Sequence, residues 1–269
     1  MTPSSGRQAE DIDTSKPHPA RMYDYFLGGK DNYEVDRAAA HRFMAAAPEV
    51  RTSVLANRTF LQRAVRHLVA DAGIRQILDI GTGLPTAPNV HQIAQRIAPD
   101  TRVAYVDNDS IVHTHTNVLL AESENTSIVL GDLRDPQEIL DHPGVRKVID
   151  FGEPVALLLV AVLHFVTDAE EPGTIVRTLR DALPAGSYLA LSHTTPDFHA
   201  DGRAEAAAVY KSATASMNPR PRAQVLDLFG DFTLLEPGLV QVPLWRPDGP
   251  LPADSDQVGM YAGVARKDA

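Results

Sequence analysis

ILDIGTGLPT, residues 77–86, places two glycines after an apolar run and leads into a segment with helical spacing. Residues 76–80 have the length and apolar character of a buried strand, and a helix is expected over residues 90–97. Gly81 and Gly83 lack side chains, so the backbone amides of the turn can approach a ligand closely. This stretch therefore predicts the opening unit of an α/β fold, with a ligand-binding turn at its centre.

Strands and helices alternate after this unit. The expected strands are RVAYVD (102–107), SIVLGD (127–132), PVALLLVAV (154–162) and GSYLALSH (186–193), and the expected helices span 110–121, 174–183 and 203–216. The uninterrupted apolar character of 155–163 is typical of a strand covered on both faces. Two β-like runs, 233–245 and 260–265, close the chain. We predict an open, mostly parallel sheet with helices on both faces.

The chain before the first strand has a helical pattern. The Gly28-Gly29 pair is expected to separate two short helices, and a longer helix is expected over 52–70. Gly73 is a plausible end for this longer helix.

These patterns predict one domain preceded by a tail. Residues 1–16 are polar and are expected to be disordered. We expect a single domain over 17–269, made of an N-terminal helical segment (17–72) and a Rossmann-like core (73–269).

Composition excludes several classes of function. The absence of cysteine rules out disulfides, thiolate metal sites and a cysteine nucleophile. The net charge of −10 is opposite to that of a protein that neutralises a phosphate backbone, so no nucleic-acid partner is expected. The apolar run 155–163 is shorter than the roughly 20 residues that span a membrane, and the N-terminus lacks the apolar core of a secretory signal. No membrane partner and a cytoplasmic location are therefore expected.

Acidic side chains end the second and third predicted strands. Asp107 follows Gly83 by 24 residues, and Asp132 ends the third strand. The carboxyl ends of parallel strands meet at one edge of the sheet, where ligands bind in α/β folds. An acid at the position of Asp107 accepts both hydroxyls of a ribose in nucleotide-binding folds of this type. The three strand ends together predict a nucleotide-like ligand.

Other glycine-containing or metal-binding motifs fit poorly. The Gly-Lys pair at 29–30 lacks the first glycine and the Ser or Thr of a phosphate loop. A dinucleotide fingerprint would need glycine where Thr86 stands. His113 and His115 fall in a predicted helix, where side chains two residues apart diverge, so no metal site is expected. No G-x-S-x-G motif of a hydrolase occurs.

Three motifs carry a resemblance to a known family. LDIGTGLPT, VAYVDND and SIVLGDLRD, in this order, resemble the first three motifs of class I S-adenosylmethionine (SAM)-dependent methyltransferases. PARMYDYFLGGKDNYEVDR and NRTFLQRAVRHL resemble an actinobacterial branch, the SAM-dependent methyltransferase family once called domain of unknown function 574. The resemblance implies a seven-stranded Rossmann-like sheet with an antiparallel last strand, and SAM as cofactor. Pro85 departs from the superfamily, in which a third glycine is usual.

The resemblance also implies where SAM contacts the chain. Its amino-acid end would face Asp79, Gly81, Thr82 and Gly83. Its ribose would contact Asp107, and its adenine would lie beside Asn108, Asp132 and Leu133. Residues 161–164, beginning with Ala161, would line the methyl donor and the substrate entrance.

Two histidines and an N-terminal lid complete the predicted site. A base is needed only if the methyl acceptor must lose a proton. His164 is the first candidate and His193 the second, because both follow predicted strand ends. We also expect residues 21–33 to cover the crevice, with the aromatic rings of Tyr23 and Tyr33 near the sulfonium. The lid group further includes Lys30 and Arg58, which could meet the cofactor carboxylate.

These observations predict a SAM-dependent methyltransferase that acts on an unidentified small molecule. A SAM-binding regulator or sensor without methyl transfer is the alternative, because no unmistakable catalytic residue is present. An NAD-dependent oxidoreductase is less favoured, because of Thr86 and the acidic end of the third strand. The sequence makes no prediction of oligomeric state.

Overall fold

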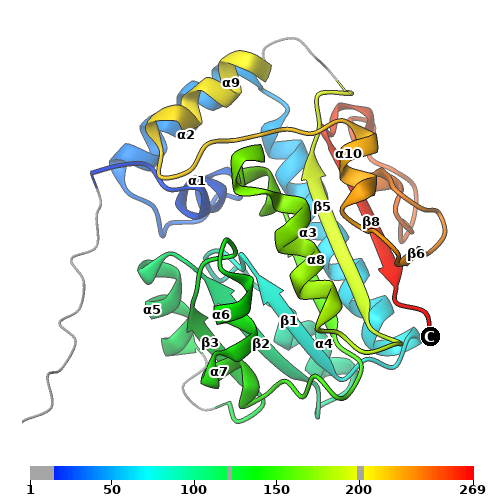
Figure 1. Ribbon diagram of the computed structural model, residues 1–269. Helices are drawn as coiled ribbons and strands as arrows, with labels where there is room; N and C mark the ends of the chain where they lie inside the picture. The colour runs from blue at the N-terminus through cyan, green and yellow to red at the C-terminus, as the bar shows by residue number, and fades with distance from the viewer. Residues whose placement is uncertain (1–14, 120–122, 199–202) are drawn as a thin grey trace, which may run out of the picture.

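The computed structural model describes residues 15–119, 123–198 and 203–269, and the predicted disordered tail lies almost entirely outside them. Within these ranges, no helix has both the length and the apolar character needed to cross a membrane. A single mixed sheet organises the fold (Figure 1). Its strands are β1 (Gln76–Ile80), β2 (Arg102–Asp107), β3 (Thr126–Leu130), β4 (Ala156–Val160), β5 (Tyr188–Thr194), β6 (Thr233–Leu234), β7 (Val240–Gln241) and β8 (Met260–Arg266).

The strand order creates a crevice beside β1. The order is β3-β2-β1-β4-β5-β8-β6, with β7 also paired to β8. Neighbours among the first five strands are parallel, whereas β8 is antiparallel to β5. Chain order reverses where β1 pairs with β2 on one side and β4 on the other, and ligands bind at such reversals. The predicted mostly parallel, Rossmann-like sheet with an antiparallel last strand is confirmed.

The number of strands differs from the predicted seven. The run 233–245 forms two separate strands of two residues each, β6 and β7. Pro237 cannot donate a bond to a strand ladder, and Gly238 turns the chain with a φ of 87°. The run therefore breaks between the two strands, and the sheet has eight.

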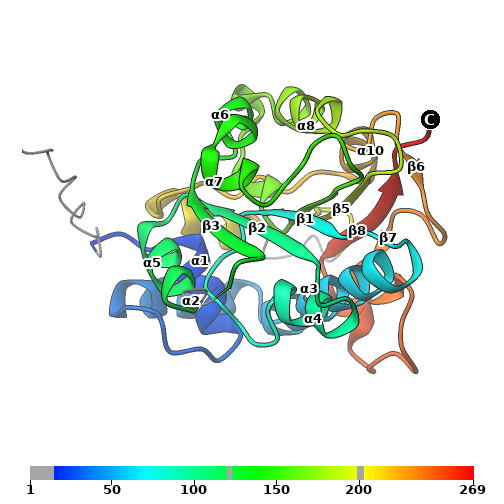
Figure 2. The same ribbon diagram turned by 90° about the horizontal axis from the view of Figure 1, so that it is seen from below.

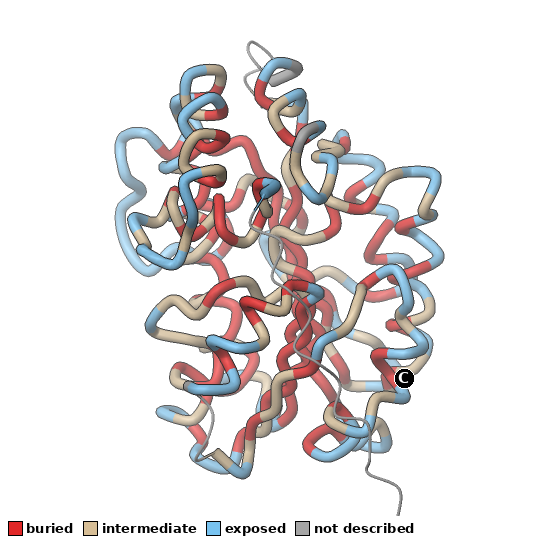
Figure 3. Tube along the Cα trace, turned by 90° about the vertical axis from the view of Figure 1, so that its left-hand side faces the viewer, coloured by how far each residue is buried: buried red, intermediate tan, exposed pale blue. Residues whose placement is uncertain are grey.

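Helices cover both faces of the sheet (Figure 2). One face carries α3 (Val50–Arg66), α4 (Val90–Ile97) and α5 (Ser110–Leu119), and the other carries α6 (Pro136–Asp141), α7 (Pro143–Arg146), α8 (Pro172–Asp181) and α10 (Arg222–Asp227). Alternate residues of β4 face opposite sides: Leu157 and Leu159 join one apolar cluster, while Ala156 and Leu158 join the other. The buried strands accordingly form the centre of the molecule (Figure 3).

Short helices account for most differences from the predicted element order. The sequence pattern does not predict α6, α7 and α10, because helices of 6, 4 and 6 residues are too short to show helical periodicity. The helix expected over 203–216 ends early, since α9 (Arg203–Val209) gives way to a 3-10 turn over Tyr210–Ser212. The helix expected to reach 121 is described to Leu119, and residues 120 and 121 lie outside the described residues.

The N-terminal helices lie beyond the carboxyl ends of the strands (Figure 1). α1 (Pro19–Phe26) and α2 (Glu34–Ala46) are separated by the predicted glycine turn, in which Gly28 has a φ of 83°. They pack against α9 and the 3-10 turn that follows it: Phe43 lies 5.7 Å from Phe26 and 5.6 Å from Tyr210 of this turn, between ring centroids. Phe60 of α3 instead joins the core beneath the sheet, so the helical segment is attached to the sheet through α3.

Candidate active site

A cavity of about 390 Å³ lies at the carboxyl ends of β1, β2, β3 and β4. Its walls also include α1 and α3, so the N-terminal segment covers the crevice beside β1. Eleven of the predicted site residues line it: Tyr23, Arg58, Asp79, Gly81, Thr82, Gly83, Asp107, Asn108, Asp132, Leu133 and Ala161.

The glycine turn has the backbone conformation that only glycine adopts easily. Gly81 and Gly83 have φ values of 75° and 67°. At Gly81 space is also missing, because a Cβ would lie 2.3 Å from Cγ2 of Val162. At Gly83, apart from its two neighbours in sequence, no atom of the described residues lies within 4 Å of the corresponding position. The turn thus needs glycine at Gly81 for both conformation and space, and at Gly83 for conformation alone.

Asp107 joins the end of β2 to this turn. Its Oδ2 accepts a hydrogen bond from the Gly83 amide at 2.8 Å, and its Oδ1 accepts from the Asp109 amide at 3.0 Å. Burial raises the pKa of Asp107 to about 6, against the lowering effect of these amide bonds. A carboxylate has about four acceptor positions, so Asp107 can still accept bonds from two ligand hydroxyls.

Asp79, at the end of β1, is a buried acid whose negative charge is only partly stabilised by its neighbours. Burial raises its pKa to about 7, although Arg58 and a 3.4 Å hydrogen bond from Thr82 Oγ1 oppose the rise. Arg58 donates hydrogen bonds to the carbonyls of Thr86 and Pro88, and its buried Nε has no hydrogen-bond partner among the described residues. A ligand ammonium would stabilise the Asp79 carboxylate, and a ligand carboxylate could pair with Arg58.

Asp132 lies just after the carboxyl end of β3 and interacts there with an arginine. Its Oδ1 accepts from the Arg134 amide at 2.9 Å and its Oδ2 from Arg134 Nη1 at 2.8 Å. Asn108 Nδ2 lies 3.4 Å from the same Oδ2, and Arg134 also pairs with Glu170 at 2.7 Å. Arg134 lines the cavity and is absent from the predicted site. The only sequence signal for it is its place two residues after Asp132.

The residue that directly follows β4 has an unusual backbone conformation. Ala161 has a φ of 57°, a left-handed conformation that is uncommon for a residue with a Cβ and typical of functional sites. Its amide donates to Ser192 Oγ at 3.0 Å, and Ser192 Oγ donates to Asn57 Oδ1 at 2.6 Å. Asn57 Nδ2 donates in turn to Tyr23 Oη at 3.0 Å. These hydrogen bonds connect the end of β4 to α1.

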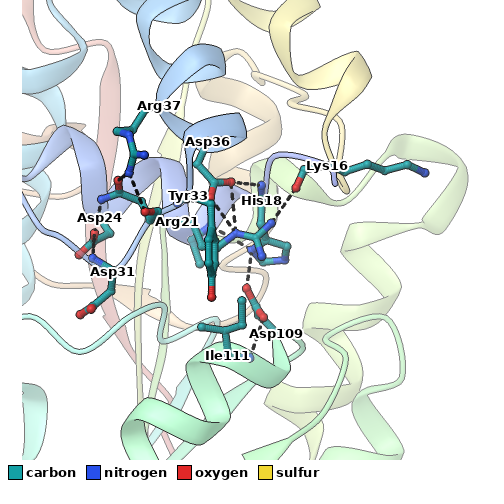
Figure 4. Close-up of polar contacts among 12 residues, drawn as sticks. Lys16, His18, Arg21, Asp24, Asp31, Tyr33, Asp36, Arg37, Asp109 and Ile111 are labelled. Carbon is teal, nitrogen blue, oxygen red and sulfur yellow. Dashed lines mark hydrogen bonds and ion pairs between the residues drawn. The ribbon is translucent and has the colours of Figure 1, made fainter. Parts of the chain in front are cut away.

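The predicted lid residues are only partly brought together. Tyr23 lines the cavity, whereas Lys30 and Tyr33 do not, and both of these are exposed. The ring of Tyr33 lies instead against the Arg21 guanidinium, at 5.5 Å (Figure 4). A residue that sequence reasoning missed, His18, lines the cavity and lies 3.1 Å from Asp109 between Nδ1 and Oδ2.

Neither predicted base lines this cavity, and the two histidines differ from each other. His193 is buried with both ring nitrogens engaged: Nδ1 lies 2.7 Å from the Thr194 carbonyl, and Nε2 lies 3.1 Å from Arg220 Nη1. Burial and Arg220 lower the pKa of His193 to about 4, so it stays neutral. His164 is also buried, but no described residue hydrogen-bonds its Nδ1, and it lines a smaller cavity next to the first.

Comparison with known proteins places the chain in a family. Residues 5–268 match the family described as S-adenosyl methyltransferase. A protein of Thermobifida fusca YX, provisionally named a methyltransferase, is 42% identical, with a TM-score of 0.91 over 96% of this chain and 97% of that one. A domain-of-unknown-function-574 protein of Streptomyces avermitilis MA-4680 is 44% identical, with a TM-score of 0.90 over 95% and 99%. No curated protein matches.

A more distant structure agrees in fold. An O-methyltransferase family protein from Burkholderia thailandensis is 11% identical, with a TM-score of 0.52 over 96% of this chain and 66% of that one. None of these comparisons supports the regulator or the oxidoreductase alternative. The glycine turn, the two buried acids and the match over nearly the whole length lead to one assignment: the chain belongs to the S-adenosyl methyltransferase family and is a SAM-dependent methyltransferase.

Proposed function

We propose that SAM binds in the 390 Å³ cavity and that the protein transfers its methyl group to a small molecule. The observation that carries this proposal is the buried acid Asp79 in the cavity wall, whose pKa burial raises to about 7 in spite of the opposing effect of Arg58. SAM brings an ammonium at its amino-acid end. Arg58, next to Asp79 in the cavity wall, would pair with the carboxylate of the same end.

The remaining parts of SAM match the acids farther along the rim. Asp107 would accept hydrogen bonds from the ribose hydroxyls while keeping its bond to Gly83. Asp132 would accept from the adenine amino group, and Asn108 and Leu133 would pack beside the ring. Asp132 would share its acceptor oxygens between the adenine and Arg134, which holds it in place.

The chain's main contribution to the reaction would be alignment. Bound SAM supplies a methyl carbon that is already electrophilic, so the protein has to hold the acceptor in line with it. Ala161, at the end of β4, lines both the main cavity and its smaller neighbour. Tyr23 also lines both cavities and accepts a hydrogen bond from Asn57, so α1 would be part of the binding site. We further propose that residues 17–269 form one domain; the cytoplasmic location stays a prediction.

Calorimetric titration tests the proposal. The wild-type protein should bind SAM and S-adenosylhomocysteine and should not bind NAD. Asp107→Ala removes the ribose acceptor and is expected to weaken SAM binding by about 10- to 100-fold, as expected for losing hydrogen bonds to a charged group. Asp181→Ala, an exposed acid at the end of α8, is the matched control. Unchanged SAM affinity in Asp107→Ala would contradict the assignment of this cavity.

A further inference from the structure

A second cavity, of about 90 Å³, lies between the N-terminal helices and the segments that follow β4 and β5. Most of its lining is apolar, and it includes Phe26, Phe43, Val54, Tyr210, Met217 and Met260. It shares Tyr23, Ala161 and Phe165 with the cofactor cavity. A molecule held there would therefore lie directly beside the end of β4, next to the place proposed for the cofactor.

Within the part of the chain that the structure describes, two buried polar atoms of the residues that line this second cavity have no hydrogen-bond partner. They are Nδ1 of His164 and Oγ1 of Thr194, and both residues line the cavity. His164 is only 3% exposed. A buried polar atom without a hydrogen bond costs about 1–3 kcal/mol, so in folded proteins such atoms are normally satisfied. Their position on one apolar cavity indicates a ligand with a polar group that both donates and accepts.

The chemistry of the two groups favours a hydroxyl. Burial, followed by the effects of His193 and Arg220, lowers the pKa of His164 well below its usual range. His164 is therefore a neutral imidazole, and its Nδ1 can accept a hydrogen bond. Thr194 Oγ1 can donate one. A ligand hydroxyl complements both groups and, unlike an ammonium, brings no charge into this mostly apolar cavity.

We propose that this cavity binds the methyl acceptor, and that the acceptor is a single-ring aromatic compound with a hydroxyl group. The inference rests on the proposed cofactor site. The hydroxyl donates to His164 Nδ1 and accepts from Thr194, while the ring packs against the phenylalanines. As the hydroxyl oxygen bonds to the methyl carbon, the C–S bond would break with its electron pair going to sulfur, and the hydroxyl proton would pass to His164 Nδ1.

The volume of the second cavity limits the proposed acceptor to a single ring. An apolar cavity of about 150 Å³ takes up benzene in another protein, so about 90 Å³ admits a single ring only if neighbours adjust. Met217 and Met260 line it, and unbranched methionine side chains adapt readily to an occupant. Two fused rings would need far larger shifts of the helices around the cavity.

Fluorine NMR with 4-fluorophenol and 4-fluorotoluene as probes tests this inference. The two probes differ only in hydroxyl against methyl, and the protein is first saturated with S-adenosylhomocysteine so that no reaction occurs. We expect 4-fluorophenol to bind about 3- to 10-fold more tightly, the effect of one or two hydrogen bonds. His164→Phe keeps a ring but removes Nδ1, and should abolish this preference while 4-fluorotoluene still binds. Thr194→Val, which keeps the side-chain shape, should reduce the preference and provides a second test should His164→Phe not fold.

A pair of methionine variants tests the location. Met217→Trp fills the cavity and should abolish binding of both probes. Met44→Trp adds the same volume to the same apolar cluster without lining the cavity, and should leave binding unchanged. Methyl transfer to 4-fluorophenol, followed by the fluorine shift of 4-fluoroanisole, should show the same pattern across the variants.

Three outcomes would overturn the inference. The first is no binding of 4-fluorophenol to protein that does bind S-adenosylhomocysteine, which leaves the cofactor assignment intact. The second is an equal preference for 4-fluorophenol over 4-fluorotoluene in the wild type, in His164→Phe and in Thr194→Val. The third is tighter binding of 4-fluoroaniline than of 4-fluorophenol, lost in Glu49→Gln, which would assign an amine acceptor to the cavity instead. Failure of S-adenosylhomocysteine itself to bind would contradict the proposed function.

Discussion

The two glycines of the ligand-binding turn offer a quantitative test of the site's geometry. Gly81 and Gly83 both have positive φ, so an alanine at either position costs about 1–2 kcal/mol. At Gly81 the added Cβ would also lie 2.3 Å from Cγ2 and 2.7 Å from Cβ of Val162, and overpacking of this kind costs a further ~1–3 kcal/mol. We expect Gly81→Ala to lower the free energy of unfolding by about 2–5 kcal/mol, and Gly83→Ala by about 1–2 kcal/mol.

Urea unfolding of the ligand-free variants, followed by circular dichroism, measures both values. A double-mutant cycle isolates the steric part. Val162→Gly removes the atoms that the new Cβ would meet, so the Gly81→Ala/Val162→Gly double variant should recover about 1–3 kcal/mol relative to the sum of the single effects. Val162→Gly should show no such coupling with Gly83→Ala. Equal losses at the two glycines, or a coupling energy near zero for Gly81, would refute the reasoning.

Three further predictions concern charge and hydrogen bonds around the cavity. Because Asp79 has a pKa of about 7, SAM affinity should rise about 5- to 10-fold between about pH 6 and pH 7.5, and calorimetry should find that Asp79→Asn loses this dependence. Between about pH 4 and pH 7 the folded, ligand-free protein holds a proton on Asp79 that the unfolded chain has lost, so its stability should fall as pH rises. Urea unfolding should accordingly find Asp79→Asn more stable than the wild type at about pH 8, by an amount on the order of a few kcal/mol, and the difference should shrink towards about pH 4. Tyr23→Phe removes a hydroxyl that bonds Asn57 and the Val54 carbonyl, and should cost about 1 kcal/mol in thermal or urea unfolding.

The parallel strands were predictable because each leaves a strong local signal. The runs at β1, β2, β4 and β5 are apolar on both faces, as strands between two helical layers must be. The elements that escaped prediction have no such signal. A helix of four residues such as α7 has no period, and the break between β6 and β7 depends on how Pro237 and Gly238 sit against β8.

The acids of the site were predictable from their place at strand ends, but most of their partners were not. Asp79, Asp107 and Asp132 follow apolar runs, so topology alone brings them to one edge of the sheet. Asn57 and Ser192 are 135 residues apart, and their 2.6 Å hydrogen bond joins α3 to β5. A contact of this kind depends on the packing of the helix against the sheet, which no local pattern specifies.

The two candidate bases show most clearly that local sequence patterns do not specify contacts between distant residues. By sequence, His164 is the first candidate and His193 the second, on the same ground that each follows an apolar run that ends at the rim. The structure separates them through Arg220, which lies 3.1 Å from His193 Nε2 and also binds the carbonyls of Leu163 and Val166. Arg220 thereby takes up the Nε2 of His193, and its bonds to the two carbonyls stabilise the turn that carries His164. A base needs a free nitrogen next to the acceptor more than a place at a strand end. Among the described residues the Nδ1 of His164 has no partner, and His164 lines the cavity proposed for the acceptor.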